Sequence, residues 1–213
     1  MYACLKATAS EAHVFVITAD QRGSRISDDL VPRALEIVRA AAPDAPVLGP
    51  ERTIGDEIQV AVADADAALA IILALSRSQR WSIGLGIGDV EEPYPTSIRA
   101  ARGSAFIRAR DAVGDAKRAP GRLSIAPDAS PHASDAQALI RLLIDVRDRR
   151  TDEGWEVYDL LAQGMTQRDA AQALGVTAAA VSLRARAAGL RIEEGALPAL
   201  VRALSAAGNA PTP

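Results

Sequence analysis

Short apolar runs alternate with longer segments of helical period along the first 125 residues of the chain. The apolar runs are rich in β-branched residues and predict five strands, at residues 14–17, 47–53, 57–63, 81–90 and 122–125. The spacing of apolar positions predicts helices at residues 30–42, 64–75 and 96–118, the last interrupted near Gly103. This order of elements predicts an α+β domain of the ferredoxin-like or palm type, with one helical layer on an antiparallel sheet.

The predicted strand at residues 81–90 carries a glycine at every second position of its central part. Gly84, Gly86 and Gly88 alternate with apolar residues, so one face of the strand is nearly without side chains. Such a face permits the close approach of a backbone, a helix or a ligand, and a flat packing surface is the simplest interpretation.

A connector rich in Pro, Ser and Asp, at residues 127–134, is followed by a region without strand patterns. It suggests that the chain has two domains. We expect an α+β domain at residues 1–127, a linker at 128–135, an all-α domain at 136–207 and a tail at 208–213.

The all-α region opens with a predicted amphipathic helix at residues 136–149. Its apolar side chains are expected on one side, at Leu139, Leu142, Leu143 and Val146. The mixed-charge run at residues 145–153 is best interpreted as a solvated face rather than a binding site.

Residues 155–190 carry helix-end signals at the spacing of a helix-turn-helix. Threonine favours the first position of a helix and glycine favours its end or a tight turn. The signals follow one another as Gly164, Thr166, Gly175 and Thr177. Ala171 is small enough for two helices to cross closely, and Val181 suits the buried anchor of the last helix.

The last helix, residues 177–187, has small and polar outer positions that suit the major groove of DNA. We expect Thr177, Ala178, Ala179 and Ser182 to face the bases, with Arg184 and Arg186 on the same helix and Gln167 and Arg168 against phosphate. The alternative is a helical hairpin with a purely structural role.

The overall charge neither favours nor excludes nucleic acid as a partner. The formal net charge of the 213 residues is −3, so DNA binding requires a local basic patch. Only two of the 24 basic residues are lysine, and arginine suits bidentate contacts with phosphate and guanine. One cysteine, Cys4, and two histidines exclude an internal disulfide and argue against a zinc site. We expect a cytoplasmic protein without a membrane segment or a nucleophilic catalytic residue.

Two aspartates stand where predicted strands end. Asp20 follows the apolar run 14–17, and Asp56 follows Gly55 at a predicted two-residue hairpin turn. If the hairpin pairs beside the first strand, the two carboxylates converge and, together with substrate phosphates, provide ligands for Mg²⁺ or Mn²⁺. Local turn chemistry alone is the alternative explanation for each aspartate.

The loop after Asp20 adds groups that suit phosphate. Backbone N–H groups and guanidinium side chains bind phosphate oxygens well. The loop supplies them at Arg22, Gly23, Ser24 and Arg25. The sequence therefore predicts a metal site at Asp20 and Asp56, with a nucleotide beside this loop and Gly55.

Four segments resemble, in the same order, the motifs of the SatD family, a little-characterised bacterial group. These segments are residues 18–25, 55–59, 83–90 and 103–110. More distantly they resemble class III nucleotide cyclases and the related diguanylate cyclases. The resemblance covers residues 14–117 and implies a palm-type fold and homodimerisation through this domain. It places Asp20 and Asp56 at the metal-binding aspartates of those enzymes, and a nucleotide between the sheet and the loop after Asp20.

The chain also departs from the cyclase pattern. Ile107 and Asp111 stand where cyclases of this class carry an asparagine and an arginine for ribose and transition-state phosphate. Loss of one such donor costs a factor of about 100 to 1,000 in rate. The only asparagine of the chain is Asn209, near the end of the sequence.

The same resemblance makes three other arginines candidate nucleotide ligands. Arg108 and Arg110 lie near the position of the missing arginine but out of register, and Arg52 lies where base-selecting lysines often sit. They are therefore expected at the nucleotide.

Three functions follow from these patterns. The first is a DNA-binding transcriptional regulator whose cyclase-like domain binds a nucleotide with Mg²⁺, dimerises, or does both without turnover. The second is an active Mg²⁺-dependent nucleotidyl cyclase or nucleotidyltransferase with a DNA-binding domain. The third is an assembly module that uses the first domain only for dimerisation.

Overall fold

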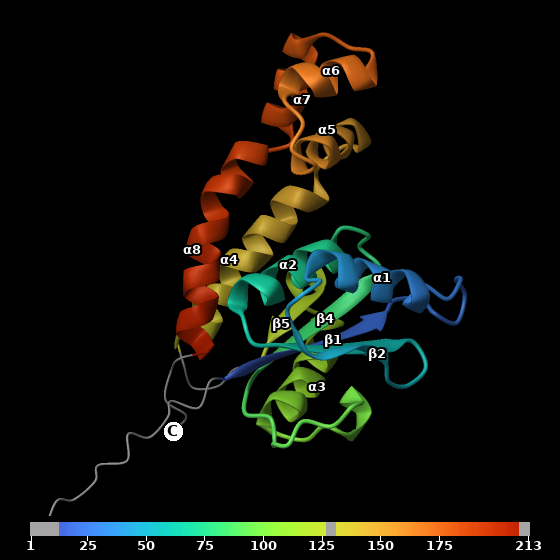
Figure 1. Cartoon of the computed structure of the whole chain (residues 1–213), viewed down its shortest axis with the longest axis vertical. Helices are drawn as coiled ribbons and strands as arrows, with labels where there is room; N and C mark the ends of the chain where they lie inside the picture. The colour runs from blue at the N-terminus through green and yellow to red at the C-terminus, as the bar shows by residue number, and fades with distance from the viewer. Residues whose placement is uncertain (1–12, 127–130, 209–213) are drawn as a thin grey trace, which may run out of the picture.

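The computed structural model describes residues 13–126 and 131–208 of the chain. Figure 1 shows a sheet covered by helices, from which two long helices lead to a group of shorter ones. Cys4, Asn209 and parts of the expected linker and tail lie outside the described residues. None of the described helices is long and apolar enough to cross a membrane.

The five strands form one sheet in the order β2-β3-β1-β4-β5. They are β1 (Val14–Gln21), β2 (Pro46–Arg52), β3 (Glu57–Val62), β4 (Trp81–Gly88) and β5 (Leu123–Ile125). The first four strands are antiparallel to their neighbours, which is the ferredoxin-like arrangement expected from the sequence. The fifth strand pairs in parallel with β4 at the edge of the sheet.

Helices cover both faces of this sheet, so the expectation of one helical layer is wrong. Helices α1 (Val31–Ala41) and α2 (Ala65–Ser76) pack on the face that carries Phe15 and Ile17. Helix α3 (Ser104–Ala116) packs on the other face, which carries Val14 and Val16, and lies below the sheet in Figure 1. Successive residues of β1 point to opposite faces, and both sets are apolar, so the strand is buried on both sides.

The glycine face of β4 is the surface on which α3 lies. A Cβ at Gly84 would stand 2.2 Å from the backbone nitrogen of Val113, and one at Gly86 would stand 2.1 Å from the carbonyl oxygen of Ala105. Only glycine permits this approach of helix backbone to strand backbone. The close contact predicted from the sequence is confirmed, and its partner is a helix of the same domain. A short 3-10 helix at Ile98–Ala100 precedes α3, and the two are separated near Gly103, where the sequence predicted an interruption.

The two long helices share the core of the α+β part. Helix α4 (Pro131–Asp148) and helix α8 (Leu190–Gly208) lie side by side in Figure 1 and pack against each other and the sheet layer. Their buried residues in the main core include Ile140, Ile144, Leu200, Leu204 and Ala207.

This packing corrects two expectations about the helical region. Residues 131–135 of the expected linker are the first turns of α4, and the division at residues 127 and 136 does not separate two hydrophobic cores. The buried face of α4 also differs in part from the expected one: Leu143 is buried as expected, but Leu139 and Leu142 are 45% and 62% exposed.

Three short helices at the far end of α4 and α8 form the predicted helix-turn-helix. They are α5 (Asp152–Ala162), α6 (Gln167–Leu174) and α7 (Ala178–Ala187). Gly175 ends α6 in the left-handed conformation, with φ of 65°. The small core between the helices contains Val157, Ala170, Ala171, Val181 and Ala185.

Candidate nucleic-acid interface and nucleotide pocket

The outer face of α7 is free of other elements of the described chain. Val181 and Ala185 point into the small core, which turns the opposite side of the helix to solvent. The exposed residues on and beside this helix include Thr177, Ala178, Ala179, Ser182 and Arg186. All five are residues expected to meet DNA.

The start of α6 is held by a reciprocal pair of hydrogen bonds. The Thr166 hydroxyl accepts from the backbone N–H of Asp169 at 3.2 Å, and the Asp169 carboxylate accepts from the backbone N–H of Thr166 at 3.3 Å. The Thr166 hydroxyl also donates to Asp169, and these bonds lower the pKa of that carboxyl. Gln167 and Arg168 are exposed beside this cap.

The two arginines of α7 have different surroundings. Arg184 is half-buried and its guanidinium lies 3.5 Å from the Glu156 carboxylate on α5. The described residues provide no hydrogen bond or ion pair for the side chain of Arg186, which is exposed. Arg186 is therefore the guanidinium of this helix that is available for a partner without breaking an internal contact.

Asp20 lies near the end of β1 on the face that α3 covers. The neighbouring residue Gln21 points to the opposite face, because side chains alternate along a strand. The Asp20 carboxylate accepts a hydrogen bond from Lys117 Nζ at 3.0 Å, just after α3, and its side chain is 21% exposed. In this structure Asp20 is neutralised by a lysine.

Asp56 lies in the turn between β2 and β3, as the sequence predicted. The Ile54 carbonyl accepts from the Glu57 N–H at 3.0 Å, which places Gly55 and Asp56 at the two central positions of the turn. Gly55 has φ of 59°, and the Asp56 carbonyl accepts from the Gln21 N–H at 3.1 Å. The hairpin therefore pairs beside β1.

A shallow pocket of about 340 Å³ lies between this hairpin and the loop after β1. It is lined by Gln21, Ser24, Arg25, Ser27, Asp29, Arg52, Gly55 and Asp56. Five of these were expected at a nucleotide or metal, and Gln21, Ser27 and Asp29 were not. Asp20 does not line it, so the pocket contains one of the two expected aspartates. Within residues 13–126 and 131–208, no cluster of three or more His, Cys, Asp or Glu residues is arranged to hold a metal ion.

Hydrogen bonds fix the walls of this pocket. The buried Gln21 amide accepts from the Leu30 N–H at 2.9 Å and donates to the Asp28 carbonyl at 2.7 Å, which closes the loop. Arg52 forms an ion pair with Asp29, and this contact lowers the pKa of the Asp29 carboxyl. Asp29 could have been found from its place before a predicted helix, where an acidic side chain is common.

The remaining expected nucleotide ligands lie outside the pocket. Arg22 is exposed and its guanidinium donates to the Gln79 carbonyl at 3.1 Å, and Gly23 has φ of 69°. Arg108 and Arg110 belong to α3 on the other side of the sheet, and Arg108 donates to the carbonyl of Ile87. The structure therefore separates the arginines of α3 from the pocket that Arg25 and Arg52 line.

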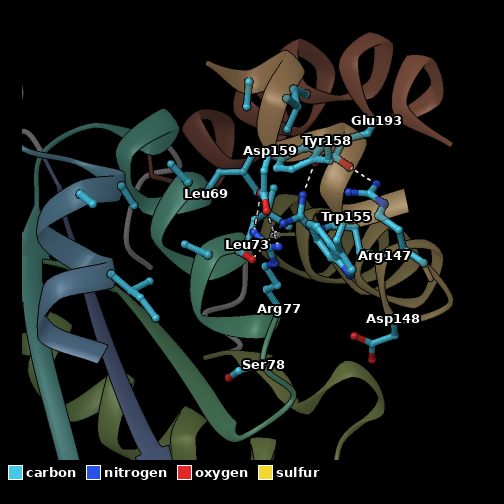
Figure 2. A pocket seen from close by; sticks show the side chains of 18 of the residues that line it. Leu69, Leu73, Arg77, Ser78, Arg147, Asp148, Trp155, Tyr158, Asp159 and Glu193 are labelled. Carbon is cyan, nitrogen blue, oxygen red and sulfur yellow. Dashed lines mark hydrogen bonds and ion pairs between the residues drawn. The ribbon is translucent and has the colours of Figure 1, made fainter. Parts of the chain in front are cut away.

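A second cavity, a groove of about 1420 Å³, lies where α1 and α2 face α5 and α8. Arg147 and Arg150 both pair with the buried carboxylate of Glu193, and the guanidiniums of Arg77 and Arg150 lie 4.2 Å and 4.3 Å from the centre of the Trp155 ring. Figure 2 shows this cluster with Arg77 extending from α2.

The cluster corrects the interpretation of residues 145–153 as a solvated face at two positions, while Asp145, Arg149 and residues 151–153 are exposed as expected. Arg147 and Arg150 are only 4% and 7% exposed. The helical spacing indicated the burial of Arg147, because this residue follows the buried residues Leu143 and Ile144 by four and three positions. It shares their buried face of α4.

Comparisons with known proteins do not assign the chain to a family. No protein-family model matches the sequence, and no curated protein matches it. One similar solved structure is the regulator of polyketide synthase expression from Bifidobacterium adolescentis, at 17% identity and a TM-score of 0.29, with 92% of this chain and 80% of that chain covered. A TM-score this low does not establish a shared fold.

Proposed function

We propose that the protein is a DNA-binding transcriptional regulator. The observation that carries this proposal is the set of helices α5 to α7, in which α7 presents an exposed face of small and polar residues together with the apolar side chain of Leu183. A recognition helix of this kind enters the major groove with its first residues at the base edges. Arg186 supplies a guanidinium that is able to reach a guanine edge, the commonest specific contact in such complexes.

Phosphate contacts fit the surrounding residues. Gln167 and Arg168 are exposed at the start of α6, the helix that crosses the backbone in complexes of this type. Since the whole chain carries a net charge of −3, these local contacts have to provide the electrostatic attraction. Two helix-turn-helix units in a homodimer would bind two half-sites of an inverted repeat.

The finer proposal is that the α+β part is a cyclase-like domain of the SatD type that binds a nucleotide with Mg²⁺ and does not turn it over. The pocket between the hairpin and the loop after β1 supports nucleotide binding through Arg25, Arg52 and the N–H groups of the loop. The exposed Ile107 at the place of the cyclase asparagine argues against the alternative, an active nucleotidyl cyclase.

The metal part of this proposal has a direct test at Lys117. If Asp20 binds Mg²⁺ or Mn²⁺, the metal has to displace the Lys117 ammonium. Lys117→Met should therefore lower the metal concentration at which the Tm rises. A nucleoside triphosphate with Mn²⁺, at about 100 times its Kd, should raise the wild-type Tm by about 5 to 10 °C. Asp20→Ala and Asp56→Ala should each remove this rise. An unchanged metal dependence in Lys117→Met would contradict Asp20 as a ligand.

DNA binding is tested by selection of genomic fragments with the purified full-length protein, with and without nucleotide. The proposal predicts that bound fragments share an inverted repeat whose half-sites are about one helical turn apart. Fragments enriched without any common sequence would contradict specific recognition by α7.

A further inference from the structure

The loop after β1, residues 22–30, is connected to a short segment between α2 and β4, residues 77–80. The Arg22 N–H donates to the Arg80 carbonyl at 2.7 Å, and the Arg22 guanidinium donates to the Gln79 carbonyl at 3.1 Å. This loop supplies half of the pocket proposed for the nucleotide. Its position is therefore tied to the segment 77–80.

The same segment also holds the helix-turn-helix. Arg77 donates to both oxygens of the Asp159 carboxylate on α5, at 2.7 Å and 2.8 Å. The Arg77 guanidinium also lies over the Trp155 ring, another residue of α5, as Figure 2 shows. The Gln79 amide donates to the Asp148 carbonyl at the end of α4, at 3.4 Å.

The backbone of this segment is held in an uncommon conformation. Gln79 has φ of 55°, one of two positive values among the described residues other than glycine. Residues with side chains rarely adopt this region, and such positions persist only where their surroundings hold them. At Gln79 those surroundings are Arg22 on one side and α4 on the other.

We propose that residues 77–80 transmit the state of the loop after β1 to the helix-turn-helix. The loop biases the segment through Arg22, and the segment biases the orientation of α5 through the Arg77 contact with Asp159 and Trp155. Occupation of the pocket and the angle of the DNA-binding helices are thereby coupled. That this coupling controls DNA binding rests on the proposed function, whereas the mechanical coupling does not.

Amide hydrogen exchange of the full-length protein, without ligand or DNA, tests the coupling. Arg22→Ala should raise exchange in residues 152–187 by about two- to 30-fold, the range expected for a mutation along a coupling network. In the Arg77→Ala background the same change should have a clearly smaller effect on residues 152–187, because the contact of the segment with α5 is removed and only the Gln79 contact with α4 remains. Arg25→Ala is the matched control, since no hydrogen bond of the described residues joins Arg25 to the segment.

Two results would overturn the proposal. One is unchanged exchange of residues 152–187 in Arg22→Ala. The other is an equal rise in the wild-type and Arg77→Ala backgrounds, which would show that the effects are independent. If the exchange experiment shows the coupling but the protein selects no DNA, the transmission stands and only the proposed regulatory function is refuted.

Discussion

Replacement of Gly86 by alanine should destabilise the protein strongly, because α3 lies directly on this residue. The added Cβ would stand 2.1 Å from the carbonyl oxygen of Ala105 and 2.3 Å from the backbone nitrogen of Ala109. Non-bonded heavy atoms need about 3.5 Å, so the helix would have to move by more than about 1 Å. Both obstructing atoms belong to the backbone, so no side-chain rotation relieves the clash.

The expected loss of unfolding free energy is about 3 kcal/mol, the upper end of the usual cost of overpacking. That is a large part of the roughly 5 to 15 kcal/mol that stabilises a typical native protein. Equilibrium urea unfolding measures it, provided that the slope of the transition is unchanged.

Gly114→Ala provides the matched control in the same region. Gly114 lies within α3, is exposed and has no atom within 4 Å of an added Cβ. Alanine is favoured over glycine in a helix, so this variant should gain about 0.5 to 1 kcal/mol. A loss below about 1 kcal/mol in Gly86→Ala would refute the placement of α3 on the glycine face.

Two further variants test the helical region. Glu193→Gln should lower the free energy of unfolding in urea by about 3 kcal/mol, because it leaves two buried guanidiniums without a counter-charge. Glu194→Gln, at the exposed neighbouring residue, should change this free energy by no more than about 0.5 kcal/mol. Equal effects of the two variants would contradict the buried cluster. The pKa of Asp169 is lowered in the folded state by its bonds to Thr166, so its contribution to stability is present above the unfolded value of 3.8 and is lost as the pH falls through the folded pKa. The difference in Tm between wild type and Asp169→Asn should therefore shrink between about pH 6 and about pH 3, and a constant difference would contradict the cap.

The elements that sequence patterns predicted well are those with local signals. The two ends of α6 follow from Thr166 and Gly175, and the start of α7 follows from Thr177, because each residue satisfies or terminates the backbone within three or four residues. The turn at Gly55 and Asp56 is equally local. The ferredoxin-like strand order followed from the order of elements, since few connections are possible for that order.

The elements that were missed depend on partners distant in sequence. A bare glycine face shows that something approaches closely, but the pattern did not identify α3 as that partner or place it opposite α1 and α2. Arg147 and Arg150 belong to a charged run, and only their contact with Glu193, more than 40 residues later, makes burial possible. Charge composition alone favours the surface for such residues.

The candidate nucleotide site was predicted in part for a related reason. Hairpin and loop chemistry brought Asp56, Gly55 and Arg25 to one pocket. Asp20 and Gln21 are consecutive in β1, so only one of them can face that pocket, and the structure places Gln21 there. Packing on both faces of the sheet determines which residues of β1 point to which face. The short apolar run in the sequence did not contain this information.

The comparison of Arg186→Ala with Arg202→Ala on a DNA fragment selected by the wild-type protein tests the proposed function most directly. Both residues are exposed arginines, but Arg202 lies on α8 among residues that pack on the α+β part. Loss of Arg186 should weaken the selected fragment by about 5- to 150-fold at fixed salt and relax its sequence preference, while loss of Arg202 should leave affinity within about two-fold. Equal affinities of the two variants, or no fragment selected by the wild-type protein, would contradict DNA recognition by α7.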